Sequence, residues 1–157
     1  MPQPPLFSRV GLIGFGAFGQ LIARQLSPLV PICVYDPVQT DERPRHPSLR
    51  FGSLAETAAR PLVILAVPVS AMEPLCHALA PLVRPGTWVL DVGSVKMAPA
   101  DVMQRILPPE VNLLGTHPLF GPESTRQGTR GSENRPLPPA RRSPITLGSN
   151  VAAYLSA

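Results

Sequence analysis

The stretch from Arg9 to Leu26 constrains the fold more than any other part of this sequence. Its first six residues, RVGLIG, form an apolar run that predicts a buried parallel strand. Its last ten, AFGQLIARQL, carry apolar residues at helical spacing and predict an amphipathic helix. Where the two meet, the chain has the pattern G-x-G-x-x-G, made of Gly14, Phe15, Gly16, Ala17, Phe18 and Gly19. Between a strand and a helix, this pattern predicts a loop that binds a dinucleotide.

Each glycine of this loop has its own expected role. Gly14 permits the tight turn, Gly16 lets the backbone approach a pyrophosphate, and Gly19 lets the helix pack closely on the strand. The pyrophosphate would then meet the N-terminus of the helix, where free N–H groups and the helix dipole favour negative charge. The alternative is a turn with a structural role only.

In a dinucleotide-binding domain, an acidic residue is expected about 20 positions after the glycine motif, at the end of a second strand. The second strand is predicted over 31–35, and Asp36 follows it, seventeen residues after Gly19. The Asp36 carboxylate would accept hydrogen bonds from the adenosine ribose hydroxyls. The alternative is a turn residue before Pro37.

Asp36 also predicts which dinucleotide binds. NADP carries a phosphate on that ribose, and two like charges 4 Å apart repel by about 4 kcal/mol at an effective dielectric constant of 20. NAD is therefore expected over NADP. Arg43 and Arg45 in the next loop could accept a phosphate, although exposed loop arginines are usually only solvated.

Strand and helix patterns alternate through the rest of the first 127 residues. Strands are predicted over 49–51, 62–67, 87–92 and 111–115, and helices over 53–59, 69–82 and 99–107. Ser53, with Glu56 three positions later, predicts a capping box at the start of one helix. This alternation predicts an α/β domain over 1–127, a doubly wound, Rossmann-type parallel sheet with helices on both faces.

At about Gly128 the composition changes. Residues 128–144 have no hydrophobic period and are dense in Gly, Pro, Ser and Arg, which predicts a disordered, Arg/Pro-rich tail over 128–157. This tail holds four arginines against one glutamate, a balance of +3 that leaves +1 of the chain's net charge of +4 for residues 1–127. A basic excess confined to a tail without interleaved aromatic residues does not predict a nucleic-acid groove.

Other classes of protein are disfavoured by simple features. No apolar run reaches the length of a membrane span. Residues 1–8 leave no room for a signal peptide before the first strand, so a cytoplasmic protein is expected. Cys33 and Cys76 lie in apolar runs, which predicts buried free thiols. Without a CxxC motif or a His/Cys cluster, no metal site is expected.

Two further segments follow predicted strands, DVGSVK over 91–96 and GTHPLFGPES over 115–124. In open parallel sheets, ligands bind beyond the carboxyl ends of the strands. His117 there could act as a general base, since the pKa of histidine lies near neutrality. Ser94 could hydrogen-bond His117 or a substrate. On spacing alone, a histidine before a proline is as often structural as catalytic.

Taken together, DVGSVK, GTHPLFGPES, the opening VGLIGFGAFGQLIARQL and the strand LVILAVPV resemble the prephenate and arogenate (cyclohexadienyl) dehydrogenases of tyrosine biosynthesis. The resemblance runs from about Val10 to Gln127 and covers the N-terminal dinucleotide-binding domain of that family. It implies an NAD-dependent enzyme whose small-molecule substrate is prephenate or arogenate. The ring carbon bearing the 4-hydroxyl gives a hydride to the nicotinamide, and the ring loses carbon dioxide and becomes aromatic.

The resemblance also implies roles for individual residues. His117 would accept the hydroxyl proton, and Ser94 would hydrogen-bond both this histidine and the substrate hydroxyl. Val67 and Pro68 would line the cofactor. Lys96 matches the motif without an assignable role.

One departure from the family pattern matters. Family members continue into a long helical domain that forms a homodimer and supplies an arginine for the substrate carboxylate. Here residues 125–127 run into the Arg/Pro-rich tail, and no such arginine can be matched. A frameshifted or truncated gene product, present as the cofactor-binding half, is the expectation. The alternatives are a nucleotide-binding fragment without activity, or another Rossmann dehydrogenase of the β-hydroxyacid or pyrroline-carboxylate reductase groups.

Overall fold

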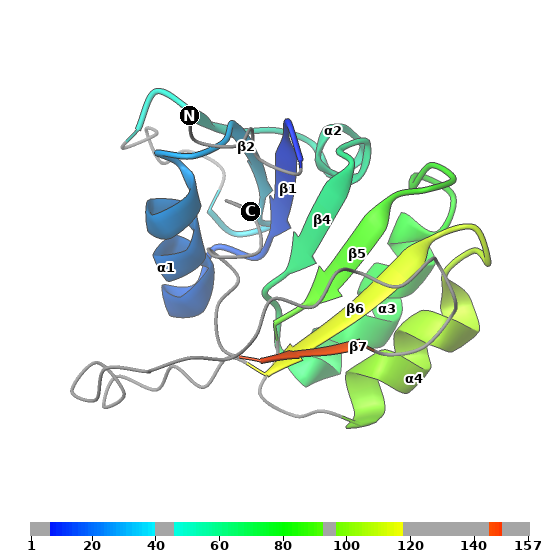
Figure 1. The fold of residues 1–157 in the computed structure, drawn as a ribbon. Coiled ribbons are helices and arrows are strands. Elements are labelled where there is room, and N and C mark those ends of the chain that lie inside the picture. Colours follow the sequence, from blue (N-terminus) through cyan, green and yellow to red (C-terminus); the bar gives the residue numbers. More distant parts are fainter. Residues whose placement is uncertain (1–6, 40–45, 93–96, 118–144, 149–157) are drawn as a thin grey trace.

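The sheet at the centre of the molecule consists of seven parallel strands. The computed structural model describes residues 7–39, 46–92, 97–117 and 145–148 (Figure 1). The strands lie in the order β3-β2-β1-β4-β5-β6-β7. Their bounds are β1 Val10–Ile13, β2 Ile32–Tyr35, β3 Leu49–Phe51, β4 Leu62–Leu65, β5 Trp88–Asp91, β6 Asn112–His117 and β7 Ile145–Gly148.

Helices cover both faces of this sheet. Their bounds are α1 Ala17–Leu26, α2 Leu54–Ala58, α3 Val69–Leu79 and α4 Met97–Ile106. In Figure 1, α1 stands on one side of the sheet, while α3 and α4 lie on the other. The chain proceeds outward from β1 to β3 and then returns to β4 on the other side of β1. This is the doubly wound, Rossmann-type arrangement that the alternating pattern predicts.

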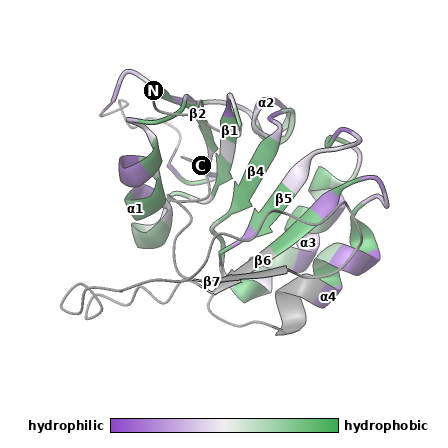
Figure 2. Cartoon of the chain, viewed as in Figure 1, coloured by the Kyte–Doolittle hydropathy of each residue, from purple (hydrophilic) through white to green (hydrophobic). Residues whose placement is uncertain are grey.

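The strands are buried on both faces because their side chains alternate between two hydrophobic clusters. Leu12 and Ile64 pack with Ile22 of α1, whereas Val63 and Leu65 pack with α3 and α4. Figure 2 shows β4 as hydrophobic along its length. Each fully buried aliphatic side chain contributes about 1.5–3 kcal/mol, so the apolar run LVIL anchors the centre of the sheet.

The predicted capping box at the start of α2 is present. The Ser53 hydroxyl accepts a hydrogen bond from the Glu56 N–H (3.2 Å), and the Glu56 carboxylate accepts one from the Ser53 N–H (2.8 Å). The Ser53 N–H and the neighbouring Arg50 lower the pKa of Glu56 below its ordinary value. Two of the N–H groups at this helix start, those of Ser53 and Glu56, are thereby satisfied.

Most of the predicted elements are present, and their ends shift by a few residues. The clear difference is β7, because the sequence predicts an irregular tail over 128–157 and residues 145–148 instead pair with β6. Four residues after a proline-rich stretch are too short to show a strand periodicity, so this strand depends on the neighbouring strand edge. The other residues of the tail lie outside the described residues.

Both cysteines are free and buried, as predicted. Burial, together with the nearby carboxylates of Asp91 and Glu73, raises the pKa of Cys76 to about 11. This thiol therefore stays protonated at neutral pH and behaves as a small apolar side chain.

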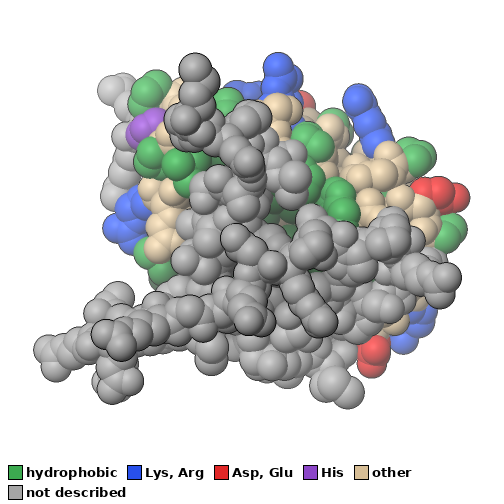
Figure 3. All heavy atoms as spheres, in the orientation of Figure 1, with side chains coloured by type: hydrophobic (Ala, Val, Ile, Leu, Met, Phe, Trp, Pro, Cys, Tyr) green, Lys and Arg blue, Asp and Glu red, His purple; other side chains and the backbone are tan. Residues whose placement is uncertain are grey.

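Charge is balanced over the described part of the chain, which holds six arginines and six carboxylate side chains. On the face shown in Figure 3, the basic side chains stand at separate places rather than in one continuous patch.

We expect Ser53→Ala to lower the free energy of unfolding by about 1 kcal/mol, because it removes the cap of α2. Ser70→Ala is the matched control, since Ser70 is exposed in α3 and its side chain forms no hydrogen bond with the described residues. Urea denaturation of the two variants measures the difference. Equal stability of both variants would show that the Ser53 hydroxyl contributes nothing to the stability of the fold.

Candidate functional site

The predicted site residues gather at one edge of the sheet. The glycine loop follows β1, Asp36 follows β2, Val67 and Pro68 follow β4, and His117 ends β6. Because all of these strands are parallel, their carboxyl ends lie along the same edge. The backbone of His117 is therefore at the same end of the sheet as the glycine loop. Ser94 lies outside the described residues.

The distance between these groups follows from the strand order. Between β1 and β6 there are three strand spacings, through β4 and β5. At about 4.8 Å for each spacing, the end of β6 lies about 14 Å across the sheet from the end of β1. An extended ligand along this edge could therefore touch both the glycine loop and the end of β6.

Two of the three glycines are required by the protein itself. Gly14 has a φ of +96°, which side-chain-bearing residues rarely adopt, and a Cβ there would overlap the Ala66 carbonyl oxygen. A Cβ at Gly19 would overlap the Gly14 carbonyl oxygen. These two glycines let the first turn of α1 lie directly against the ends of β1 and β4.

Gly16 is different, because nothing among the described residues requires a glycine there. Its φ of −68° suits any residue, and a Cβ would have no described atom within 4 Å. The Cα of Gly16 therefore faces open space at the start of α1. A glycine at such a position leaves room for a group from outside the chain.

The electrostatics of the start of α1 also favour an anion. Gly16 is the N-cap residue of α1, no side chain of the described residues caps the helix, and its first turn carries no acidic residue. The first N–H groups of a helix lack partners within the helix, and the dipole adds positive charge there. An anion such as a phosphate would meet ready-made donors at this point.

Asp36 holds the glycine loop in place, a role that its position in the sequence does not predict. One carboxylate oxygen accepts a hydrogen bond from the Phe15 N–H (2.7 Å). The other accepts hydrogen bonds from the N–H groups of Val38 (2.8 Å) and Gln39 (3.0 Å). Burial opposes ionisation of Asp36, but these three donors outweigh it and lower the pKa of Asp36 below its ordinary value.

A carboxylate offers about four acceptor positions, so Asp36 keeps roughly one for a ligand. This carboxylate is ionised at neutral pH and contacts the loop through the Phe15 N–H. A single hydroxyl donor fits the remaining position, whereas a second anion beside it would be repelled.

Phe15 and Gln20 are further parts of the loop. The Phe15 ring is buried and meets Phe51 edge to face, with ring centroids 5.1 Å apart. The Gln20 side chain donates a hydrogen bond to the Phe15 carbonyl oxygen (3.1 Å). Because its N–H is bound to Asp36 and its ring is buried in the core, Phe15 fixes the conformation of the loop. Spacing alone could not reveal these contacts.

Val67 and Pro68 lie beside the loop, between β4 and α3. A Cβ built on Gly14 would be 3.1 Å from a methyl group of Val67. Pro68 is exposed and serves as the N-cap residue of α3. The position where the strand order reverses, between β1 and β4, is thus lined by the glycine loop on one side and these two residues on the other.

Two other kinds of feature are absent from the described residues. None of their His, Cys, Asp and Glu side chains form a group of three or more that could hold a metal ion. Within the same part of the chain, no helix has the length and hydrophobicity needed to cross a membrane.

Comparison with known proteins places this chain in a family. Residues 50–137 match the family model described as prephenate dehydrogenase, nucleotide-binding domain. The match runs past residue 127, where the sequence predicts the end of the domain.

Two curated relatives match along most of this chain. A cyclohexadienyl dehydrogenase of Zymomonas mobilis is 32% identical over 128 residues, covering 76% of this chain and 43% of that protein. Arogenate dehydrogenase 1, chloroplastic, of Arabidopsis thaliana is 29% identical over 125 residues, covering 76% of this chain and 20% of that protein. The chain therefore spans less than half the length of these relatives.

A solved structure shares the fold. The prephenate dehydrogenase of A. aeolicus, in complex with hydroxyphenyl propionate and NAD+, has a TM-score of 0.62 and 21% sequence identity. The alignment covers 74% of this chain and 43% of that one. The family model matches more than half of the chain, and the two relatives are named as cyclohexadienyl and arogenate dehydrogenases. The resemblance predicted from the sequence is therefore confirmed. The chain belongs to the family of prephenate dehydrogenase nucleotide-binding domains.

Proposed function

We propose that this chain is the cofactor-binding half of an NAD-dependent oxidoreductase that converts prephenate or arogenate by oxidative decarboxylation. The observation that carries the proposal is Gly16, whose open Cα lies at an uncapped helix start next to an ionised Asp36. Membership of the family supports the binding of a nucleotide cofactor. The names of the relatives from Zymomonas mobilis and Arabidopsis thaliana support the substrates.

The residues of the site would divide the binding of NAD among them. The first N–H groups of α1 would hold the pyrophosphate over Gly16. The free acceptor position of Asp36 would take a ribose hydroxyl, and Val67 and Pro68 would line the next part of the cofactor. Gly14, Phe15, Ala17, Phe18 and Gly19 complete the loop.

The chemistry would take place at the end of β6. When bound, the nicotinamide accepts a hydride from the ring carbon that carries the 4-hydroxyl. His117 would accept the proton of that hydroxyl as general base, and Ser94 would orient both groups by hydrogen bonds. The bond to the ring carboxylate breaks, carbon dioxide leaves, and its electron pair completes the aromatic ring.

We expect the chain to bind NAD at least about tenfold more tightly than NADP, because Asp36 repels the additional phosphate. Asp36→Asn should bring the two affinities within about twofold of each other. Because the pKa of Asp36 is lowered, Asp36 stays ionised at pH 5, and the preference should narrow there only because the NADP phosphate, whose second pKa is about 6, gains a proton. Titration calorimetry measures both dissociation constants.

The ratio of the two affinities is the relevant quantity, since Asp36 also anchors the loop. Loss of that anchor would weaken both ligands together and leave the ratio unchanged. Equal affinity of the unmodified chain for both dinucleotides would remove the ribose role of Asp36.

We expect Gly16→Val to weaken NAD binding at least about tenfold, because a side chain there would occupy the place of the pyrophosphate. Its free energy of unfolding should change by no more than about 1 kcal/mol, as for an exposed N-cap position. Gly19→Val is the matched control and should destabilise the fold by about 1–3 kcal/mol or more, because it overlaps Gly14. If Gly16→Val bound NAD normally, this loop would not be the cofactor site.

We expect these 157 residues by themselves to bind NAD but to form NADH from prephenate or arogenate very slowly. No residue here is matched to the arginine that holds the substrate carboxylate, and positioning can supply about 7–11 kcal/mol of a barrier. NADH absorbance with each substrate is the measurement. Rapid turnover that His117→Ala abolishes would show that these residues suffice for catalysis.

A further inference from the structure

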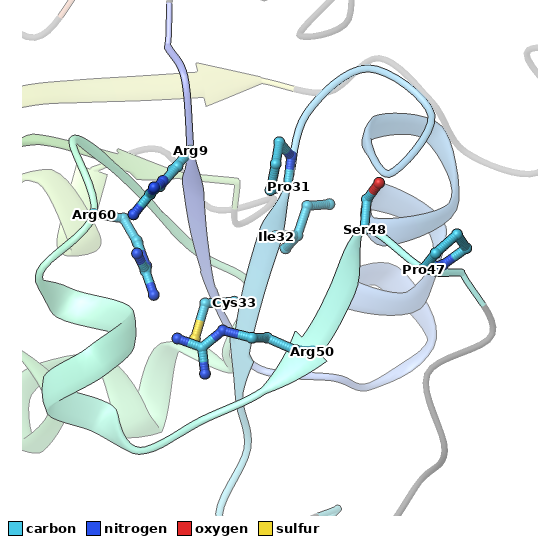
Figure 4. A pocket seen from close by; sticks show the side chains of 8 residues that line it. All are labelled: Arg9, Pro31, Ile32, Cys33, Pro47, Ser48, Arg50 and Arg60. Carbon is cyan, nitrogen blue, oxygen red and sulfur yellow. The ribbon is translucent and has the colours of Figure 1, made fainter.

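A second pocket lies at the other edge of the sheet. Its volume is about 450 Å³. Arg9, Arg50 and Arg60 line it, together with Pro31, Ile32 and Cys33 (Figure 4). In this view Arg50 reaches from β3 toward Cys33, and Arg9 and Arg60 approach from the β1 side. A pocket of this size suits a small organic ligand.

The pocket is separate from the nucleotide site. Arg9 directly precedes β1, Pro31 directly precedes β2, and Arg60 lies two residues before β4. These positions mark the amino edge of the sheet, whereas the glycine loop lies at the carboxyl edge. The four residues of β1 separate the two edges by about 13 Å.

Positive charge is concentrated at this pocket. Half of the six arginines in the described part of the chain line it. Arg50 pairs with Glu56 at 3.2 Å, and both of these side chains are about half exposed. Within the described part, Arg9 and Arg60 form no salt bridge, so two guanidinium charges at the pocket are not balanced by a paired carboxylate.

Among the three arginines, Arg60 gives the most specific indication that a ligand with hydrogen-bond acceptors binds here. Its Nε atom is buried and has no hydrogen-bond acceptor among the described residues. A buried charged donor without an acceptor is unfavourable. The planar guanidinium group offers donors in a fork that matches the two oxygens of a carboxylate or phosphate.

We propose that this pocket binds a small organic oxyanion, a free metabolite that carries a carboxylate or phosphate group. Arg60 and Arg9 hold the anionic group, and Arg50 can join them by exchanging its exposed pairing with Glu56. Pro31, Ile32 and Cys33 provide an apolar wall for the rest of the ligand. The site does not depend on the nucleotide site, and both can be filled at once.

The test is a titration of the ¹⁵N-labelled chain with inorganic phosphate and, separately, with citrate, at constant ionic strength. Saturable shifts are expected for the backbone amides of Cys33, Arg50 and Arg60 with at least one of the two probes. Phosphate alone would identify the ligand as a phosphate ester, and citrate alone as a carboxylate. Shifts confined to residues 14–19, or no saturable shifts with either probe, would overturn the proposal.

Variants assign the binding to the arginines. Arg60→Gln and Arg9→Gln should each raise the dissociation constant about tenfold or more, as expected for the loss of a charge-assisted hydrogen bond. Arg9 is exposed, so Arg9→Gln tests the site even if Arg60→Gln perturbs the fold. Arg24→Gln on α1 changes the net charge equally and should leave binding unchanged. An equal loss in Arg24→Gln would show general ionic attraction and overturn the site.

Discussion

The close contact between the start of α1 and the ends of β1 and β4 is the constraint on which the rest of the site depends. Gly19 lies against the Gly14 carbonyl, and Gly14 lies against Ala66, so there is no room for a side chain at either glycine. This contact brings the first N–H groups of α1 over the point where the strand order reverses. Gly16 then faces the space that this arrangement leaves open.

Asp36 connects this geometry to the choice of ligand. Its carboxylate ties the end of β2 to Phe15 and also turns the chain through Val38 and Gln39. The same three hydrogen bonds keep it ionised despite burial. One residue therefore both fixes the loop and places a negative charge beside it, so a substitution of Asp36 would alter the shape of the loop together with the proposed cofactor preference.

The sequence predicts the regular elements well because each is local: α1 follows from helical spacing, and the capping box of α2 from Ser53 and Glu56. It predicts the common edge of the glycine loop, Asp36 and His117 because parallel strands share their ends. It does not predict β7, whose four residues depend on β6, or the contact of Phe15 with Asp36 across 21 residues. The roles of His117 and Ser94 rest on the family resemblance.

The two edges of a parallel sheet present opposite electrostatic conditions, and the two sites differ accordingly. At the carboxyl edge, helices begin, and their N–H groups and dipoles attract anions without charged side chains. At the amino edge, helices end, and their carbonyl groups repel anions, so an anion site there needs cationic side chains. Arg60 follows the end of α2, where the dipole favours a cation, and Arg9 and Arg50 add to it. As proposed, the glycine loop and the arginine pocket would therefore bind anions at opposite edges of one sheet, the first through backbone N–H groups and the second through guanidinium groups.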